Sequence, residues 1–151
     1  MRKTYLVVLG SYGNEKKNVE EALLTYISSK ADSFGFTTEG KSTAVESFSG
    51  FLIDRQEMDV SWINEEDDAE LTDLESQEKW AAYKFTLNKS SLELLKSTDS
   101  DHDFFFYSNK EAFAKKARDD SYELVLEDEE VEQVKENLIS AGLREEDFFK
   151  L

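Results

Sequence analysis

An excess of negative charge restricts this chain more than any other feature of its sequence. It holds 34 aspartates and glutamates against 18 lysines and arginines, a formal net charge of −16 at pH 7. A chain with so high a net charge folds only if it buries enough apolar surface. Aromatic residues make up 13% of the 151 residues and include eleven phenylalanines, which is enough for a core. We therefore expect one folded domain over residues 1–151 rather than a disordered chain.

The same composition excludes several classes of partner. Phosphate backbones and anionic membranes repel an acidic surface, so we expect neither direct nucleic-acid binding nor membrane binding. No apolar run approaches the ~20 residues of a membrane span. The chain has no cysteine and one histidine, which excludes disulfides and zinc sites, and we expect no metal and no cofactor. These features suit a cytoplasmic protein and leave its oligomeric state open.

Hydrophobic periodicity predicts interleaved strands and helices. The predicted strands are residues 4–9, 34–36, 44–53, 58–63, 80–87, 103–107 and 121–126. The predicted helices are residues 15–29, 90–96, 108–118 and 128–141, the second and third of them opened by capping boxes and the last ended by Gly142. Residues 54–57 are expected to form a hairpin turn and residues 64–79 an acidic loop. The predicted class is α+β: a ferredoxin-like core of mainly antiparallel sheet with helices packed on one face, plus additions.

Clusters of acidic residues are the candidate partner-binding site. They are Glu65, Glu66, Asp67, Asp68, Glu70, Glu127, Asp128, Glu129, Glu130, Glu145, Glu146 and Asp147. A net charge of magnitude about 2–8 is enough for the solubility of a small domain, so the excess points to a role in binding. Carboxylates on a rigid surface can imitate a row of phosphates, and Trp80, Phe148 or Phe149 could add apolar anchors. The alternative interpretation is that the charge serves solubility alone.

A glycine-containing loop between the first strand and the first helix is the candidate ligand-binding site. Its residues are Gly10, Ser11, Tyr12, Gly13 and Asn14. Amides at a helix N-terminus attract anions, but this pattern is neither a P-loop nor a dinucleotide fingerprint. A tight connection is therefore the alternative interpretation.

Two further features resemble functional motifs without matching them, and the first leaves a weak divalent-cation site open as an alternative, because its three carboxylates can converge. Residues 99–103 resemble the opening of a calcium loop, but Phe104 and Lys110 stand where an EF-hand needs glycine and glutamate. We interpret this segment as a polar turn. The single histidine, His102, lies in it without a nucleophile motif elsewhere in the chain.

One family shares the order of several short segments. An apolar strand (residues 5–9) ending in small residues is followed by Asn14 and a helix, and then by Val45-Glu46-Ser47 ahead of Gly50. This layout, over residues 4–107, resembles that of the phage S-adenosylmethionine lyases. The resemblance implies a ferredoxin-like trimer with its site between subunits, which removes the methyl donor that restriction systems use. It implies Glu46, Glu57 and Glu78 as candidate catalytic residues, with Phe51 near the place of the family's tyrosine.

Three hypotheses of function follow. The charge and the lack of a catalytic motif favour a small acidic binding protein, an inhibitor from a phage or mobile element. It would occupy the basic, nucleic-acid-binding surface of a host defence protein or other host enzyme. The second hypothesis is an anti-restriction enzyme similar to the S-adenosylmethionine lyases. The third is a housekeeping domain whose acidity is incidental.

Overall fold

The computed structural model describes residues 2–39, 43–57, 80–97 and 102–151. Its strands are β1 (Lys3–Val8), β2 (Ser33–Glu39), β3 (Leu52–Glu57), β4 (Trp80–Thr86), β5 (Phe104–Ser108), β6 (Glu111–Lys116), β7 (Ser121–Leu126) and β8 (Phe148–Lys150). Its α-helices are α1 (Glu15–Lys30), α2 (Thr43–Ser47), α4 (Lys89–Ser97) and α5 (Val131–Ser140), and its 3₁₀ helices are η1 (Ser49–Phe51) and η2 (Glu145–Asp147).

The strands form one antiparallel sheet in the order β3-β4-β2-β5-β6-β7-β1-β8. This confirms the predicted α+β class and the antiparallel sheet. The finer prediction of a ferredoxin-like core is not confirmed. β1 lies between β7 and β8, whereas β2 lies at a distance from it, between β4 and β5.

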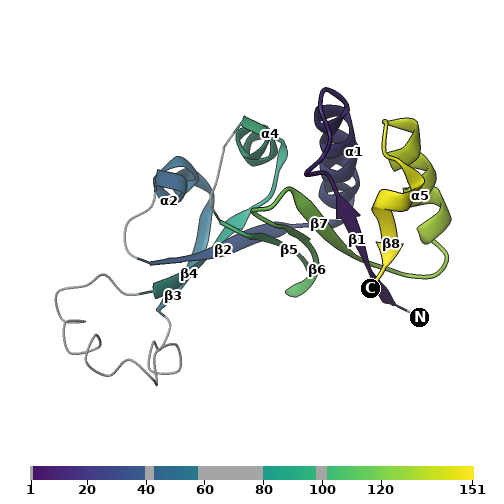
Figure 1. Cartoon of the computed structure of the whole chain (residues 1–151). Helices are drawn as coiled ribbons and strands as arrows, with labels where there is room; N and C mark the ends of the chain where they lie inside the picture. The colour runs from purple at the N-terminus through teal and green to yellow at the C-terminus, as the bar shows by residue number, and fades with distance from the viewer. Residues whose placement is uncertain (1, 40–42, 58–79, 98–101) are drawn as a thin grey trace, which may run out of the picture.

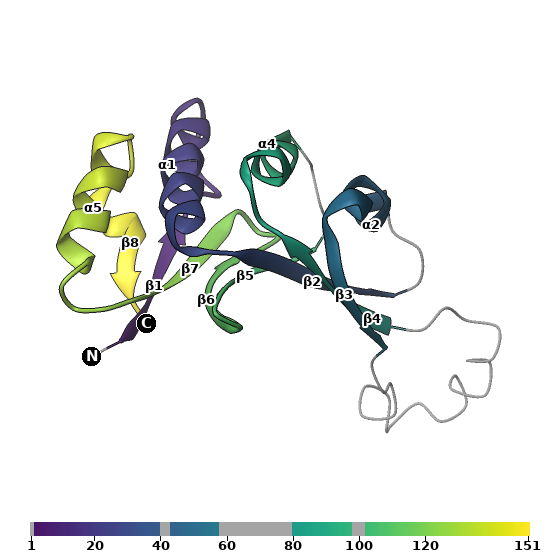
Figure 2. The ribbon, with the colours of Figure 1, turned by 180° about the vertical axis from the view of Figure 1, so that it is seen from behind.

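The helices of the described chain all lie on one side of this sheet (Figures 1 and 2). Their contacts with the strands form a core rich in phenylalanine. The ring of Phe34 in β2 stacks on Phe85 at 5.3 Å and meets Phe48 edge-on at 5.1 Å. In α1, Val19, Leu23 and Ile27 recur every four residues and are fully buried. The spacing predicts this buried stripe.

The segment predicted as a helix over residues 108–118 is a strand, and that prediction is wrong. β6 pairs with β5 and β7, and the chain reverses at Asn109 and Lys110, with φ angles of 51° and 70°. Two consecutive residues with positive φ give the turn that suits the twist of a β-hairpin. Asparagine adopts such angles readily, so Ser108–Glu111 imitates a capping box while it forms a hairpin turn.

The strand predicted over residues 44–53 is also wrong. The chain forms α2 and η1 there, and β3 begins only at Leu52. Consequently residues 54–57 are part of β3 and not a turn. The predicted strand at residues 58–63 and the acidic loop at 64–79 lie outside the described residues.

The end of the last helix follows its prediction. Gly142 has a φ of 121°, its N–H donates to the carbonyl of Ile139, and the N–H of Leu143 donates to that of Leu138. This is a Schellman motif, for which glycine is the preferred residue. α5 begins at Val131, three residues later than predicted, because residues 127–130 form a turn instead. Asn14 is the N-cap of α1, but its side chain makes no capping hydrogen bond.

Candidate functional site

The acidic residues predicted to bind a partner fall into two groups. Those between residues 65 and 70 lie outside the described residues. The others flank α5, with residues 127–130 before it and residues 145–147 in η2 after it. An ion pair of 3.2 Å between Lys135 Nζ and Glu145 Oε1 joins η2 to α5. The fold thus gathers the C-terminal acids around a single helix.

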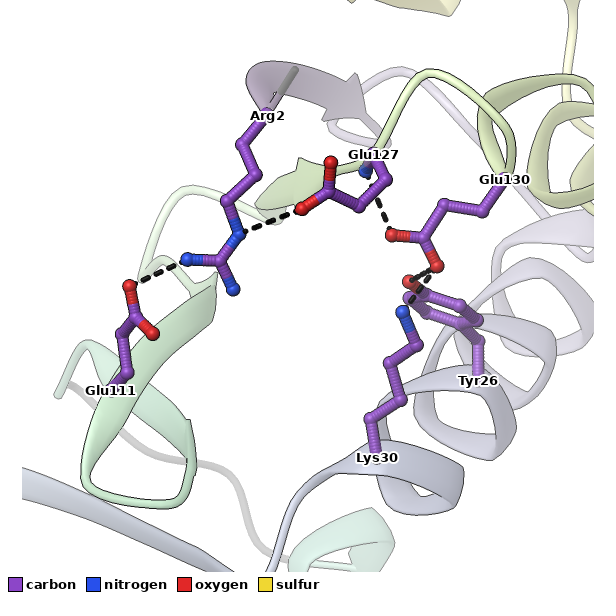
Figure 3. A network of polar contacts seen from close by, with 6 residues as sticks. All are labelled: Arg2, Tyr26, Lys30, Glu111, Glu127 and Glu130. Carbon is purple, nitrogen blue, oxygen red and sulfur yellow. Dashed lines mark hydrogen bonds and ion pairs between the residues drawn. The ribbon is translucent and has the colours of Figure 1, made fainter.

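Glu130 is the best-anchored of these acids (Figure 3). Its Oε2 accepts hydrogen bonds from the hydroxyl of Tyr26, at 3.0 Å, and from Lys30 Nζ. Its Oε1 accepts the backbone N–H of Glu127 at 2.8 Å. Burial alone would raise the pKa of Glu130, but these three hydrogen bonds outweigh it and hold the pKa below its ordinary value. Glu130 therefore connects α1 to the turn before α5, which is a structural role.

Neighbouring acids also have partners within the chain. Arg2 contacts Glu127 at 3.2 Å through Nε and Glu111 at 2.5 Å through Nη1 (Figure 3). Lys3 Nζ lies 3.5 Å from Asp128 Oδ1. These ion pairs link Arg2 and the start of β1 to the turn before α5 and to β6, so part of the predicted acidic surface is already neutralised. Exposed ion pairs of this kind contribute little to stability, typically about 0–1 kcal/mol.

A row of exposed glutamates runs from the turn before α5 along that helix. Glu129, Glu132 and Glu136 are all exposed and follow one another at spacings of three and four residues. Glu132 and Glu136 lie on one side of α5, whereas Glu129 lies in the turn before the helix. Like charges four residues apart destabilise a helix by about 0.2–0.5 kcal/mol per pair. The prediction from the sequence included Glu129 and missed Glu132 and Glu136. Their helical spacing is the signal that could have found them.

A groove lies between α1 and α5, on the side of α5 away from Glu132 and Glu136, because Val134 and Leu138, which line it, are two positions from these glutamates. The two helices are antiparallel neighbours (Figures 1 and 2), because Lys30 at the end of α1 meets Glu130 before α5, while Gly142 after α5 lies against Glu15. The groove has a volume of about 430 Å³. It is lined by Glu21, Ala22, Thr25, Tyr26, Ser29, Val134, Asn137 and Leu138.

The loop predicted to bind a ligand, residues 10–14, is joined instead to the C-terminal segment. Arg144 Nη2 donates to Ser11 Oγ at 2.7 Å, and its guanidinium lies 4.4 Å from the centre of the Tyr12 ring. The Tyr12 hydroxyl donates to Asp147 Oδ2 at 2.6 Å, and with Arg144 this bond lowers the pKa of Asp147. The described contacts of this loop are therefore those of a tight connection.

A small hollow of about 170 Å³ gathers several lysines between α1, α4 and the end of β6. Each of three lysines has a carboxylate partner: Lys16 with Asp120 at 2.8 Å, Lys96 with Glu21 at 3.5 Å, and Lys116 with Glu20 at 3.9 Å. In addition, the buried hydroxyl of Tyr122 donates to Glu20 at 2.8 Å. Burial raises the pKa of Tyr122. Lys17 is the fourth lysine of the lining, which holds three carboxylates, so the hollow is close to neutral and most of its positive charge is already paired.

The side of the sheet opposite the helices carries a row of residues, one from each strand. By the strand register the row is Asp54, Lys84, Gly35, Phe105, Lys115, Glu123, Leu6 and Phe149. Lys115 Nζ lies 5.7 Å from the ring centre of Phe105, and Lys84 Nζ lies 4.8 Å from that of Tyr107. Phe149 is 43% exposed. In the described part of the chain no helix covers this face (Figure 1).

The predicted apolar anchors and catalytic residues are dispersed. Phe148 is buried and stacks on Tyr5 at 5.3 Å, so it is not available to a partner. Glu46 is exposed on α2, Glu57 ends β3, and Glu78 lies outside the described residues. Within the described ranges no three histidine or acidic side chains gather in a way that could hold a metal ion. His102 stacks on Phe36 at 4.9 Å.

Comparison with protein-family models, with curated proteins and with solved structures finds no match for this chain. The resemblance to the S-adenosylmethionine lyases therefore stays a prediction. Of the helices that the structure describes, none has the length and hydropathy needed to cross a membrane.

Proposed function

We propose that this chain is a non-enzymatic binding protein whose acidic α5 face binds a basic surface on another protein. The observation that supports this most directly is the exposed row Glu129, Glu132 and Glu136, which lies in α5 and in the turn before it. Within α5, Glu132 and Glu136 are four residues apart and repel each other, which solubility alone does not require. A net charge of −16 extends the attraction beyond direct contact and speeds the encounter with a basic partner.

More specifically, we propose that this protein is an inhibitor encoded by a phage or a mobile element. Its target is the nucleic-acid-binding surface of a host defence protein or other host enzyme. The support is the small size, the acidity and the charge row. A surface that binds nucleic acid is rich in lysine and arginine, and closely spaced carboxylates compete for it.

The test compares two triple variants that each lose three negative charges. The first replaces the α5 row (E129Q, E132Q and E136Q), and the second replaces exposed acids elsewhere (E46Q, D54N and E93Q). Each protein is immobilised and exposed to host cell lysate at about 0.15 M and about 0.45 M salt. We expect one stoichiometric partner that is lost at high salt and lost by the first variant, but retained by the second.

Two outcomes contradict the proposal. If both variants lose the partner equally, net charge and not the α5 row determines binding. If no partner is captured at either salt, the proposal fails for the host tested. Turnover of S-adenosylmethionine by the wild-type protein is then the next measurement, because it tests the enzymatic hypothesis independently of any partner.

A further inference from the structure

Two strands carry apolar side chains on the open face, the side of the sheet that no described helix covers (Figure 1). On β1 these are Leu6 and Val8, and on β5 they are Phe105 and Tyr107. All four are partly exposed, and none of them belongs to the core. A strand with one face in water normally alternates apolar and polar residues, whereas apolar residues on both faces are typical of a sheet covered on both sides. The pattern of β1 and β5 therefore indicates that a further layer covers the open face.

The apolar surface of the open face continues onto the next strand and into a hollow. Phe149 of β8, which lies beside Leu6, is 43% exposed. The hollow has a volume of about 190 Å³ and lies over β5, β6 and β7. Its lining residues are Thr4, Phe105, Ala112, Phe113, Ala114, Lys115, Glu123 and Val125. Continuous apolar surface of this kind marks an interaction site.

The charges on this part of the face balance each other. From β5 to β8 the cross-strand row holds one lysine and one glutamate, Lys115 and Glu123, on neighbouring strands. Glu123 has no ion-pair partner in the part of the chain that the structure describes. Lys115 Nζ lies 3.8 Å from Asp103, which also accepts the backbone N–H of Arg118 at 3.0 Å, so Asp103 keeps a partner if Lys115 turns to another carboxylate. Two opposite charges side by side are complementary to the same pair in reverse order.

We propose that the open face binds a second copy of this chain, sheet against sheet. A two-fold axis in the plane of the interface, between β6 and β7, places Lys115 of each copy opposite Glu123 of the other. The same axis places Phe105 on β5 opposite Leu6 on β1. The contact is isologous, because both copies use the same patch. Packed sheets cross at about 30° and lie about 10 Å apart, so the residues nearest the axis stay opposed.

The face is large enough for such a contact. The six strands from β2 to β8 in the sheet order lie about 4.8 Å apart and are up to about 20 Å long, which gives roughly 500 Å² in projection on each copy. The pair thus buries about 1,000 Å², the lower limit for a specific interface. Repulsion between the acidic copies is limited, because the exposed glutamates of α5 lie on the helix side (Figure 1). Two sheets about 10 Å apart separate them, which exceeds the Debye length of about 8 Å at physiological salt.

Two charge variants test the contact at the axis. Glu123→Lys leaves each copy with two lysines there, and Lys115→Glu leaves each copy with two glutamates. Sedimentation velocity at about 1 to 100 μM protein measures the dimer. We expect each variant alone to dimerise at least about tenfold more weakly than the wild type, and an equimolar mixture of the two to recover the dimer. Within each chain the two charges stay alike in the mixture, so recovery reports the contact between copies and not the stability of the fold.

Two apolar variants locate the contact on the molecule. Phe149→Asp alters the open face, whereas Ile139→Asp alters α5 on the helix side, and the two side chains are 43% and 40% exposed. Because both are already exposed in the single chain, we expect both variants to fold, which circular dichroism checks. We expect F149D to weaken the dimer by about tenfold or more and I139D by less than about twofold.

Several outcomes overturn the dimer. A wild-type chain that stays monomeric at about 100 μM overturns it, as do equal losses in F149D and I139D. A mixture of E123K and K115E that stays monomeric overturns the two-fold contact. The dimer is independent of the proposed function, and salt separates the two. We expect the dimer to persist at about 0.45 M salt, where the partner in the lysate is lost, because salt screens the repulsion between copies. A dimer lost at that salt overturns the apolar contact, whereas failure of the lysate experiment overturns only the proposed function.

Discussion

The two faces of the sheet differ in what their aromatic side chains pack against. On the helix side, Phe34 contacts the rings of Phe48, Phe85, Phe104 and Phe106 and is fully buried. On the opposite side, lysine side chains lie over Phe105 and Tyr107, and no described helix packs there. The same residue type thus serves as core on one face and as partly solvated surface on the other. Stability should depend on the first face far more than on the second.

Removal of a ring from the helix side should have the largest effect. We expect Phe34→Ala to lower the free energy of unfolding by roughly 3–5 kcal/mol, because it leaves a cavity among rings that cannot collapse fully. Phe149→Ala, on the opposite face, removes a ring that is 43% exposed and should cost about 0.5 kcal/mol or less. Urea denaturation followed by circular dichroism measures both. Similar losses for the two variants would show that the faces are energetically equivalent.

A second test concerns the sheet between the two faces. A Cβ atom at Gly35 would lie 2.4 Å from the backbone oxygen of Tyr83, whereas one at Gly50 would meet nothing within 4 Å. We expect Gly35→Ala to destabilise the protein by about 1–3 kcal/mol, because β2 and β4 must move apart. Gly50→Ala is the matched control and should change stability by less than about 0.5 kcal/mol. Thermal unfolding of both variants is the measurement, and a stable G35A protein would contradict this strand pairing.

The smallest loss of stability is expected at Glu130, which connects the turn before α5 to α1. Glu130→Gln weakens the bonds from Lys30 and Tyr26 and should cost roughly 1–2 kcal/mol at pH 7. Glu129→Gln alters the adjacent exposed acid and should cost less than about 0.5 kcal/mol.

The lowered pKa of Glu130 determines in which pH range E130Q should be less stable than the wild type. Because the folded state lowers the pKa of Glu130, its stabilisation is complete above the ordinary value of 4.5 and is lost as the pH falls through the folded pKa. The difference between the wild type and E130Q, measured by urea denaturation, should therefore shrink below about pH 4.5. A difference independent of pH would show that the carboxylate charge of Glu130 contributes nothing to stability.

Local patterns in the sequence correctly predicted the elements whose structure depends mainly on residues close to them in the chain. The apolar run of β1, the stripe of α1 at spacings of four, the alternation in β7 and the glycine after α5 all carry their own signals. The acids at residues 128–130, by contrast, were expected in the first turn of the last helix and lie in the turn before α5.

Tertiary structure decided the rest, because pairing partners far apart in sequence leave no local signal. β6 carries a helix-like pattern and became a strand because β5 and β7 supply backbone partners on both sides. Arg2 and Lys30 determine which of the C-terminal acids are neutralised, from more than 95 residues away. Two further features depend on the assembled sheet, whose strand order differs from the order of the strands in the chain. They are the groove between α1 and α5 and the open face of the sheet. The sequence by itself therefore determined how much negative charge the protein carries, and only the fold decided where that charge remains free to act.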